Sequence, residues 1–148
     1  MMFSKDDFTI SLRENENDIL NFQKEKGVIL PPSYLYVLFN FGEIKYNHKV
    51  KYYYSDEIYR NILLDKIPSI NTLRLWMDNY WDNLMKENQN LDNKYLPILN
   101  TYAPNVMFLV GIQEFNLDKI FLYDDDYEGF NPIFIANDLF EFLKIKVK

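Results

Sequence analysis

Apolar residues at helical spacing predict a pair of short helices in the first third of the chain. Ile19 and Phe22 share one helical face, and Gly27 follows as a residue that readily adopts the left-handed conformation ending a helix. Pro31-Pro32 then begins a second helix, because the first helical turn does not use the N–H donors that proline lacks. This second helix is expected to end at Gly42. Its predicted buried stripe is Tyr34, Leu35, Leu38 and Phe39.

The widest apolar face of the chain lies in its middle third. Its members recur at i, i+3, i+4, i+7, i+8 and i+11, the spacing of a broad amphipathic helix. Ser69 or Asn71 can cap the start of this helix with a side-chain oxygen. A core role is expected for this face, and a ligand pocket lined by Trp76, Tyr80 and Trp81 is the alternative. The whole face consists of Leu73, Trp76, Met77, Tyr80, Trp81 and Leu84.

Short apolar runs separated by turn residues follow this helix and predict a strand meander. The expected strands are Tyr95–Leu99, Val106–Ile112 and Lys119–Tyr123, with Ile133–Ile135 as a short fourth. The connections between the last strands are too short for parallel crossovers, which need a dozen residues or more. The sheet is therefore expected to be antiparallel.

A closing helix is predicted after Asn137 or Asp138, either of which can cap it. Its inward-facing residues are expected to be Leu139, Phe140, Leu143 and Val147. The order of helices, meander and helix is typical of an α+β fold. We therefore predict a single domain over residues 1–148, in which an antiparallel sheet combines with an N-terminal helix pair, a middle amphipathic helix and a C-terminal helix.

The region between the helix pair and the middle helix carries weaker signals. Residues 43–46 and 50–54 flank Asn47-His48, so we predict a hairpin there. Residues 8–12 alternate apolar and polar positions, as in a short strand. Residues 55–66 fit a helix and a strand equally well.

One motif in the helix pair resembles a known family. Residues 27–34 match the pattern G-V/I-x-L-P-x-x-Y, which is typical of the SUKH superfamily and in particular of its Smi/Knr-type branch. Asn40-Phe41-Gly42-Glu43 stands where members carry a doubled glycine, so the turn there is expected to differ. Later segments resemble the family's strands and closing helix in the same order, and the resemblance spans residues 15–146. These segments are 95–98, 119–124 and 135–143.

The resemblance implies a function as well as a fold. Most bacterial members of this superfamily look like immunity proteins, which bind and neutralise a cognate toxin domain in the cytoplasm of the producing cell without catalysis. The eukaryotic members imply the alternative, an intracellular scaffold or regulatory protein-interaction domain. The chain shows no disordered extension of the kind that those members carry, which favours the immunity protein.

Charge restricts the partners of this chain. Its 22 acidic and 16 basic residues give a net charge of −6, whereas nucleic-acid-binding proteins normally present a basic face. Lys45, Lys49 and Lys51 form a candidate local basic patch, but on this background we expect no nucleic-acid binding. An acidic surface suits a basic protein partner, for example a nuclease toxin.

Composition also indicates the compartment. The chain has no cysteine, which excludes disulfides and thiolate chemistry and is compatible with a reducing cytoplasm. No apolar segment approaches the roughly 20 residues that a membrane helix needs, and the first twelve residues lack the apolar run of a secretory signal. We therefore expect a cytoplasmic protein without membrane contact.

Few side chains suggest catalysis or metal binding. His48 is the single histidine, and no serine has the sequence context of a hydrolase nucleophile. Asp124-Asp125-Asp126 is the best metal candidate, but it lacks the alternating spacing of an EF-hand loop. The four glycines are not grouped into a phosphate-binding loop. We expect no enzymatic activity, no cofactor and no bound metal.

Two segments carry the chemistry expected of a partner-binding surface. Consecutive side chains in a strand alternate between faces, so at least one of three successive tyrosines should be exposed. An acidic turn follows the strand that ends at Tyr123, and its carboxylates suit lysine or arginine on a basic toxin. The predicted partner-binding residues are Tyr52, Tyr53, Tyr54, Asp124, Asp125 and Asp126.

Overall fold

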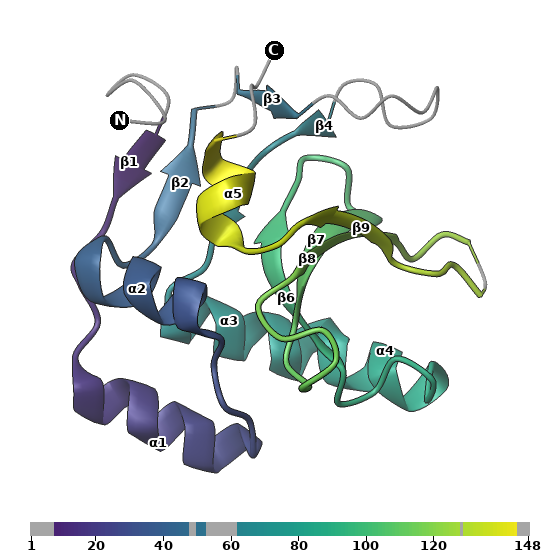
Figure 1. Ribbon diagram of the computed structural model, residues 1–148, viewed down its shortest axis with the longest axis horizontal. Coiled ribbons are helices and arrows are strands. Elements are labelled where there is room, and N and C mark those ends of the chain that lie inside the picture. The colour runs from purple at the N-terminus through teal and green to yellow at the C-terminus, as the bar shows by residue number, and fades with distance from the viewer. Residues whose placement is uncertain (1–7, 48–49, 53–61, 128, 145–148) are drawn as a thin grey trace.

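The computed structural model describes residues 8–47, 50–52, 62–127 and 129–144, and within them the chain is α+β. Its largest sheet has four antiparallel strands in the order β6-β7-β8-β9 (Figure 1). The predicted meander is confirmed, because each strand pairs with the one that follows it in the sequence. The strands are β6 (Tyr95–Asn100), β7 (Val106–Gly111), β8 (Ile120–Asp124) and β9 (Ile133–Ala136).

Two smaller antiparallel sheets precede this meander in the sequence. Their strands are β1 (Phe8–Ile10), β2 (Ile44–Tyr46), β3 (Lys51–Tyr52), β4 (Ile62–Leu63) and β5 (Lys66–Ile67). One sheet has the order β1-β2-β5, and the other pairs β3 with β4. The hairpin predicted across residues 43–54 is therefore wrong. Asn47-His48 lacks the glycine of favoured two-residue hairpin turns, so no local signal opposed pairing with more distant strands.

Backbone hydrogen bonds join the small sheets to the large one. The Asp65 N–H donates to the Asn100 carbonyl at 3.0 Å, and the Tyr102 N–H donates to the Leu63 carbonyl at 3.0 Å. Both bonds lie at the end of β6, which is an edge strand of the large sheet. The segment around β4 and β5 therefore continues the sheet beyond β6.

The N-terminal helix pair has the ends that the sequence predicts. Asn15 caps α1 (Glu16–Lys26) by accepting from the Asp18 N–H at 2.9 Å, and Gly27 ends it with a φ of +66°. Helix α2 (Pro32–Asn40) begins at the predicted proline pair. Gly42 follows its end with a φ of +71° and donates its N–H to the Val37 carbonyl at 3.0 Å.

The predicted stripe of α2 needs one correction. Phe39 is 41% exposed, whereas Val37 is fully buried. Val37 and Leu38 lie three and four residues after Tyr34, on the same helical face. Phe39 lies about 100° further around the helix than Leu38, which turns it away from the core.

One continuous helical segment runs from residue 70 to residue 87. It consists of α3 (Ile70–Trp76), the π-helical turn η1 (Met77–Trp81) and α4 (Asp82–Glu87). Of the two predicted caps, Ser69 is correct, because its hydroxyl accepts from the Thr72 N–H at 3.2 Å. We refer to this segment below as the long helix.

The buried face of the long helix follows a spacing of four residues. A four-residue step advances about 40° around an α-helix, so an unbroken α-helical series would rotate away from the core. A π-helical turn holds more residues, and η1 brings the later positions back to the same side. Trp76, Tyr80 and Leu84 of the predicted face are only half-buried. The buried residues on this face are Leu73, Met77, Trp81 and Met85.

Helices cover both faces of the large sheet (Figure 1). The Trp81 ring meets the Tyr123 ring on one face, with centroids 6.4 Å apart. On the other face the Phe142 ring of α5 (Leu139–Lys144) lies 5.0 Å from the Phe108 ring. Phe108 pairs with Leu122, the neighbour of Tyr123, so Phe108 and Tyr123 point to opposite sides.

The closing helix is capped by Asp138, whose Oδ1 accepts from the Glu141 N–H at 2.8 Å. Phe140 is only half-buried, and Val147 lies outside the described residues. The prediction omitted Phe142, which lies deeper in the core than Phe140. The buried residues of α5 are Leu139, Phe142 and Leu143.

The hydroxyl of Tyr34 ties α2 to the segment before the long helix. Its side chain is fully buried, and its hydroxyl donates to the Pro68 carbonyl at 2.6 Å. Burial raises the pKa of this hydroxyl well above its usual value, as do the nearby charges of Glu14 and Glu43. The group therefore remains a protonated donor at any pH at which the protein is handled.

Replacing Tyr34 with phenylalanine is expected to lower the free energy of unfolding by about 1–3 kcal/mol, because the Pro68 carbonyl loses this donor in a dry site. Urea denaturation followed by circular dichroism measures the change. The matched control is Tyr36→Phe, since Tyr36 lies on the same helix and is 49% exposed. The control should stay within about 0.5 kcal/mol of the wild type. Equal losses in the two variants would contradict the role of the buried hydroxyl.

Candidate functional site

The acidic turn after β8 contains one buried carboxylate and two exposed aspartates. Asp124 is 1% exposed, and its Oδ1 accepts from Asn105 Nδ2 at 2.9 Å and from the Asp126 N–H at 3.0 Å. Asp125 and Asp126 are exposed. Of the three aspartates predicted to bind a partner, Asp124 therefore shapes the turn, and Asp125 and Asp126 lie at the surface.

The same turn holds Asp125 in an unfavourable electrostatic position. Its N–H donates to the Asn105 carbonyl at 2.9 Å, which fixes the backbone beside the buried Asp124. Partial burial raises the pKa of the Asp125 carboxyl, and the charges of Asp126 and Asp124 raise it further. Because folding disfavours its charged form, stability is lost as the pH rises through the folded pKa. A cation that approaches this turn would relieve the repulsion.

Tyr52 belongs to the core and not to the surface. It is 6% exposed, and its ring lies 5.3 Å from the Phe108 ring and 5.6 Å from the Phe142 ring. Tyr53 and Tyr54, the other two tyrosines of the predicted surface, lie outside the described residues. The structure thus brings Tyr52 together with α5 and leaves it apart from the acidic turn.

Aromatic rings follow the acidic turn and connect it to the long helix. The Tyr127 ring lies 6.4 Å from the Phe130 ring, which in turn lies 5.9 Å from the Tyr123 ring. Tyr127 is half-exposed. The Tyr123 ring contacts Trp81 of the long helix, with centroids 6.4 Å apart. Burial raises the pKa of Tyr80 in the same helix to about 12, with a contribution from the charge of Asp125.

A second row of rings crosses the same face of the large sheet. The Phe121 ring of β8 lies 5.2 Å from the Tyr95 ring of β6 and 6.0 Å from the Phe134 ring of β9. Phe121 and Tyr123 are two residues apart in one strand, so both rows lie on the side covered by the long helix. Phe134 is 50% exposed. We call these six residues the aromatic face: Tyr95, Phe121, Tyr123, Tyr127, Phe130 and Phe134.

The sequence contained part of the signal for this face. Alternation along β8 already places Phe121 and Tyr123 on one side of the sheet. Tyr127 and Phe130 lie in the connection between β8 and β9, where no periodicity relates them to the strands. Their ring contacts depend on how that connection folds back, so the sequence analysis missed them.

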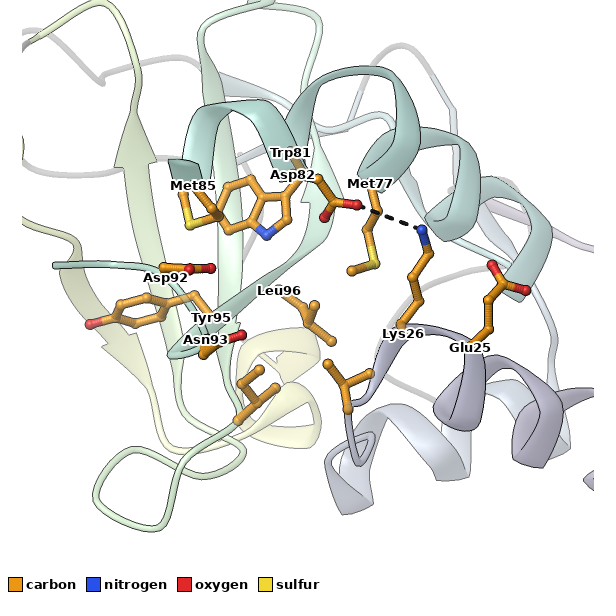
Figure 2. Close-up of a pocket in the computed structure, with 12 residues that line it drawn as sticks. Glu25, Lys26, Met77, Trp81, Asp82, Met85, Asp92, Asn93, Tyr95 and Leu96 are labelled. Atoms are coloured by element: carbon orange, nitrogen blue, oxygen red, sulfur yellow. Dashed lines mark ion pairs between the residues drawn. The ribbon is translucent and has the colours of Figure 1, made fainter. Parts of the chain in front are cut away.

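A cavity of about 280 Å³ lies between the end of α1, the long helix and the start of β6 (Figure 2). Its apolar walls come from the long helix and the sheet, and its rim carries charged side chains. The apolar lining consists of Val28, Met77, Trp81, Met85, Tyr95, Leu96 and Ile112, and the polar lining consists of Glu25, Lys26, Asp82, Asp92 and Asn93.

Ion pairs fix one side of the cavity rim. Lys26 Nζ contacts Asp78 and lies 3.6 Å from Asp82 Oδ2, the pair marked in Figure 2. Burial alone would lower the pKa of Lys26. The hydrogen bond to Asp78 and the neighbouring carboxylates outweigh this effect, so the pKa of Lys26 is above its usual value. Glu25 pairs with Arg74 at 3.0 Å. The ammonium of Lys26 is thus neutralised by carboxylates and is not directed at a ligand.

The cavity and the aromatic face are neighbours. Tyr95 lines the cavity and contacts Phe121, while Trp81 lines the cavity and contacts Tyr123. Exposed aspartates, half-exposed rings and an acidic-rimmed cavity therefore lie along one side of the large sheet. This combination suits recognition of a basic protein surface.

Within the described residues, no group of three or more His, Cys, Asp or Glu side chains is placed to hold a metal ion. The same part of the chain contains no helix long and apolar enough to cross a membrane. No protein-family model matches this chain, and no curated protein matches it. The arrangement of the acidic turn and the aromatic face is therefore the main guide to function.

Proposed function

We propose that this protein is a non-catalytic immunity protein that binds and neutralises a basic toxin domain. The observation that carries this proposal is the acidic turn, in which Asp125 and Asp126 stand exposed beside the aromatic face. Interfaces draw most of their binding energy from a few aromatic or charged residues, and opposite charges speed the encounter of partners. The net charge of −6 favours a basic partner such as a nuclease toxin.

The resemblance to the SUKH superfamily supports this function. The residues that carry the resemblance have distinct structural roles in this chain. Gly27 adopts the left-handed conformation that ends α1, and the buried Leu30 and Pro31 lead into α2. The Tyr34 hydroxyl then bonds the Pro68 carbonyl. A helix pair held in this way, followed by an antiparallel meander and a closing helix, agrees with the architecture that the resemblance implies.

The test uses the toxin domain encoded beside this protein's gene and a charge variant of the exposed aspartates. The double variant Asp125→Asn, Asp126→Asn is expected to slow association with the toxin by about tenfold at 0.05 M salt, because it removes electrostatic steering. The difference should shrink at 0.5 M salt, where screening acts within a few ångströms. Biolayer interferometry at the two salt concentrations measures both rates.

The matched control is Glu16→Gln, Asp18→Asn, which changes the net charge equally in the first turn of α1. Helix α1 lies on the far side of the molecule from the acidic turn (Figure 1). The control should associate at nearly the wild-type rate. Equal slowing in both variants would show that net charge matters and that this turn does not. Failure of the wild type to bind or inhibit any neighbouring toxin would overturn the proposed function.

A further inference from the structure

The cavity beside the aromatic face has the size of a site for one side chain. Its volume of about 280 Å³ lies just below the range of ligand pockets, which span roughly 300–1,000 Å³. Met77, Trp81 and Met85 of the long helix form one apolar wall, and Leu96 of β6 lies opposite (Figure 2). Polar side chains surround this apolar interior, so an occupant with an aliphatic stem and a polar end fits the lining.

Trp81 turns its polar group toward the cavity (Figure 2). The residue is 2% exposed, yet its indole N–H donates to no other described residue. Figure 2 shows the indole nitrogen directed into the space bounded by Met77 and Leu96. This nitrogen is not sealed in the core but open to the cavity, so a water in the cavity can accept its hydrogen bond.

The backbone of the long helix is irregular at the same cavity. The π-helical turn η1 begins at Met77 and ends at Trp81, and both residues line the cavity. The N–H of Asp82 bonds the Met77 carbonyl across this widened turn. Turns of this kind are rare inside α-helices and occur frequently at functional sites.

The charges at the rim determine the class of occupant. Glu25, Asp82 and Asp92 line the cavity with Lys26 as the accompanying cation. Glu25 and Asp82 already pair with basic residues, whereas Asp92 is exposed and forms no ion pair with a described residue. The rim is therefore net acidic and keeps one carboxylate available for a cation.

We propose that this cavity receives an arginine side chain of the toxin, a proposal that rests on the function proposed above. The aliphatic stem packs against Met77, Met85 and Trp81, and the guanidinium reaches the carboxylate of Asp92. A guanidinium has donors only, so a water retained in the cavity accepts from the Trp81 N–H. Tyr95 and Trp81 contact rings of the aromatic face, so a toxin that binds at that face reaches the cavity.

The first arm of the test needs no toxin. N-acetyl-arginine amide is titrated into the protein while the indole N–H resonance of Trp81 is followed by NMR, with N-acetyl-glutamine amide as the neutral probe. The arginine compound should shift this resonance with a Kd of about 1–10 mM, and the glutamine compound should not. Asp92→Asn should weaken binding by about two- to fivefold, the range of an exposed ion pair. No shift with the arginine compound would overturn the proposal.

The second arm separates this proposal from the proposed function. Asp92→Lys should weaken toxin binding by at least tenfold, because it places a like charge against the arginine. The matched control Glu87→Lys makes the same charge change on α4 at an exposed residue outside the cavity lining. If the Asp92→Lys variant binds the toxin with wild-type affinity, the arginine site is overturned and the proposed function still stands. A Trp81 shift in a protein that binds no toxin would overturn the function and keep a guanidinium site.

Discussion

Replacing Trp81 with alanine is expected to lower the free energy of unfolding by about 3–5 kcal/mol, the cost of a large cavity in a core. The side chain is 2% exposed and packs edge-on against Tyr123, so its removal separates the long helix from the large sheet. Thermal unfolding followed by circular dichroism should show a melting temperature lower by roughly 10 °C or more. Urea denaturation gives the free energy itself.

Trp76 provides a matched control for this variant. It is the same residue type in the same helix, but it is only half-buried. Trp76→Ala should therefore cost less than half as much as Trp81→Ala. Equal losses, or a Trp81→Ala protein that melts within a few degrees of the wild type, would contradict the orientation of the long helix.

The ends of the helices were predictable because their causes are local. Gly27, Pro31-Pro32 and Ser69 act on backbone groups within one helical turn, so the sequence alone identifies them. The antiparallel meander was predictable for a similar reason, since short turns leave each strand beside the next. These features needed no knowledge of the rest of the chain.

Strand pairing before the long helix was not predictable in the same way. Strand β2 pairs with β1, which precedes the helix pair in the sequence, and with β5, which comes just before the long helix. The choice between a local hairpin and these distant partners depends on where the helices place each segment. The π-helical turn is a further example, because the sequence between Met77 and Trp81 has no proline or glycine to mark it.

The candidate site shows the same division between local and distant causes. A run of three aspartates indicates an acidic turn, but it does not show which carboxylate turns inward. Asn105 decides this, since its side chain donates to Asp124 from the turn between β6 and β7. Tyr52 is buried because Phe142, from the far end of the chain, stacks against it. Among the described residues that were predicted to bind a partner, Asp125 and Asp126 are exposed.

Replacing Gly42 with alanine is expected to lower the free energy of unfolding by roughly 2–5 kcal/mol, through backbone strain and overpacking together. Its φ of +71° is unfavourable for a residue with a Cβ. A Cβ at this position would also collide with the carbonyl oxygen of Leu12. The Cβ would lie 2.7 Å from Ser11 Oγ and 2.9 Å from the Leu12 carbonyl carbon. The Ser11 N–H bonds the Glu43 carbonyl at 3.0 Å, so the N-terminal segment must shift from β2 to make room.

Gly27→Ala separates the two causes of this loss. Gly27 has nearly the same φ, +66°, but a Cβ there would meet nothing within 4 Å. This variant should therefore show the backbone strain alone, about 1–2 kcal/mol. Urea denaturation of both variants measures the difference, and amide hydrogen exchange should show faster opening of β1 in Gly42→Ala only. Equal losses with unchanged exchange would mean that the N-terminal segment does not cross closely over the end of α2.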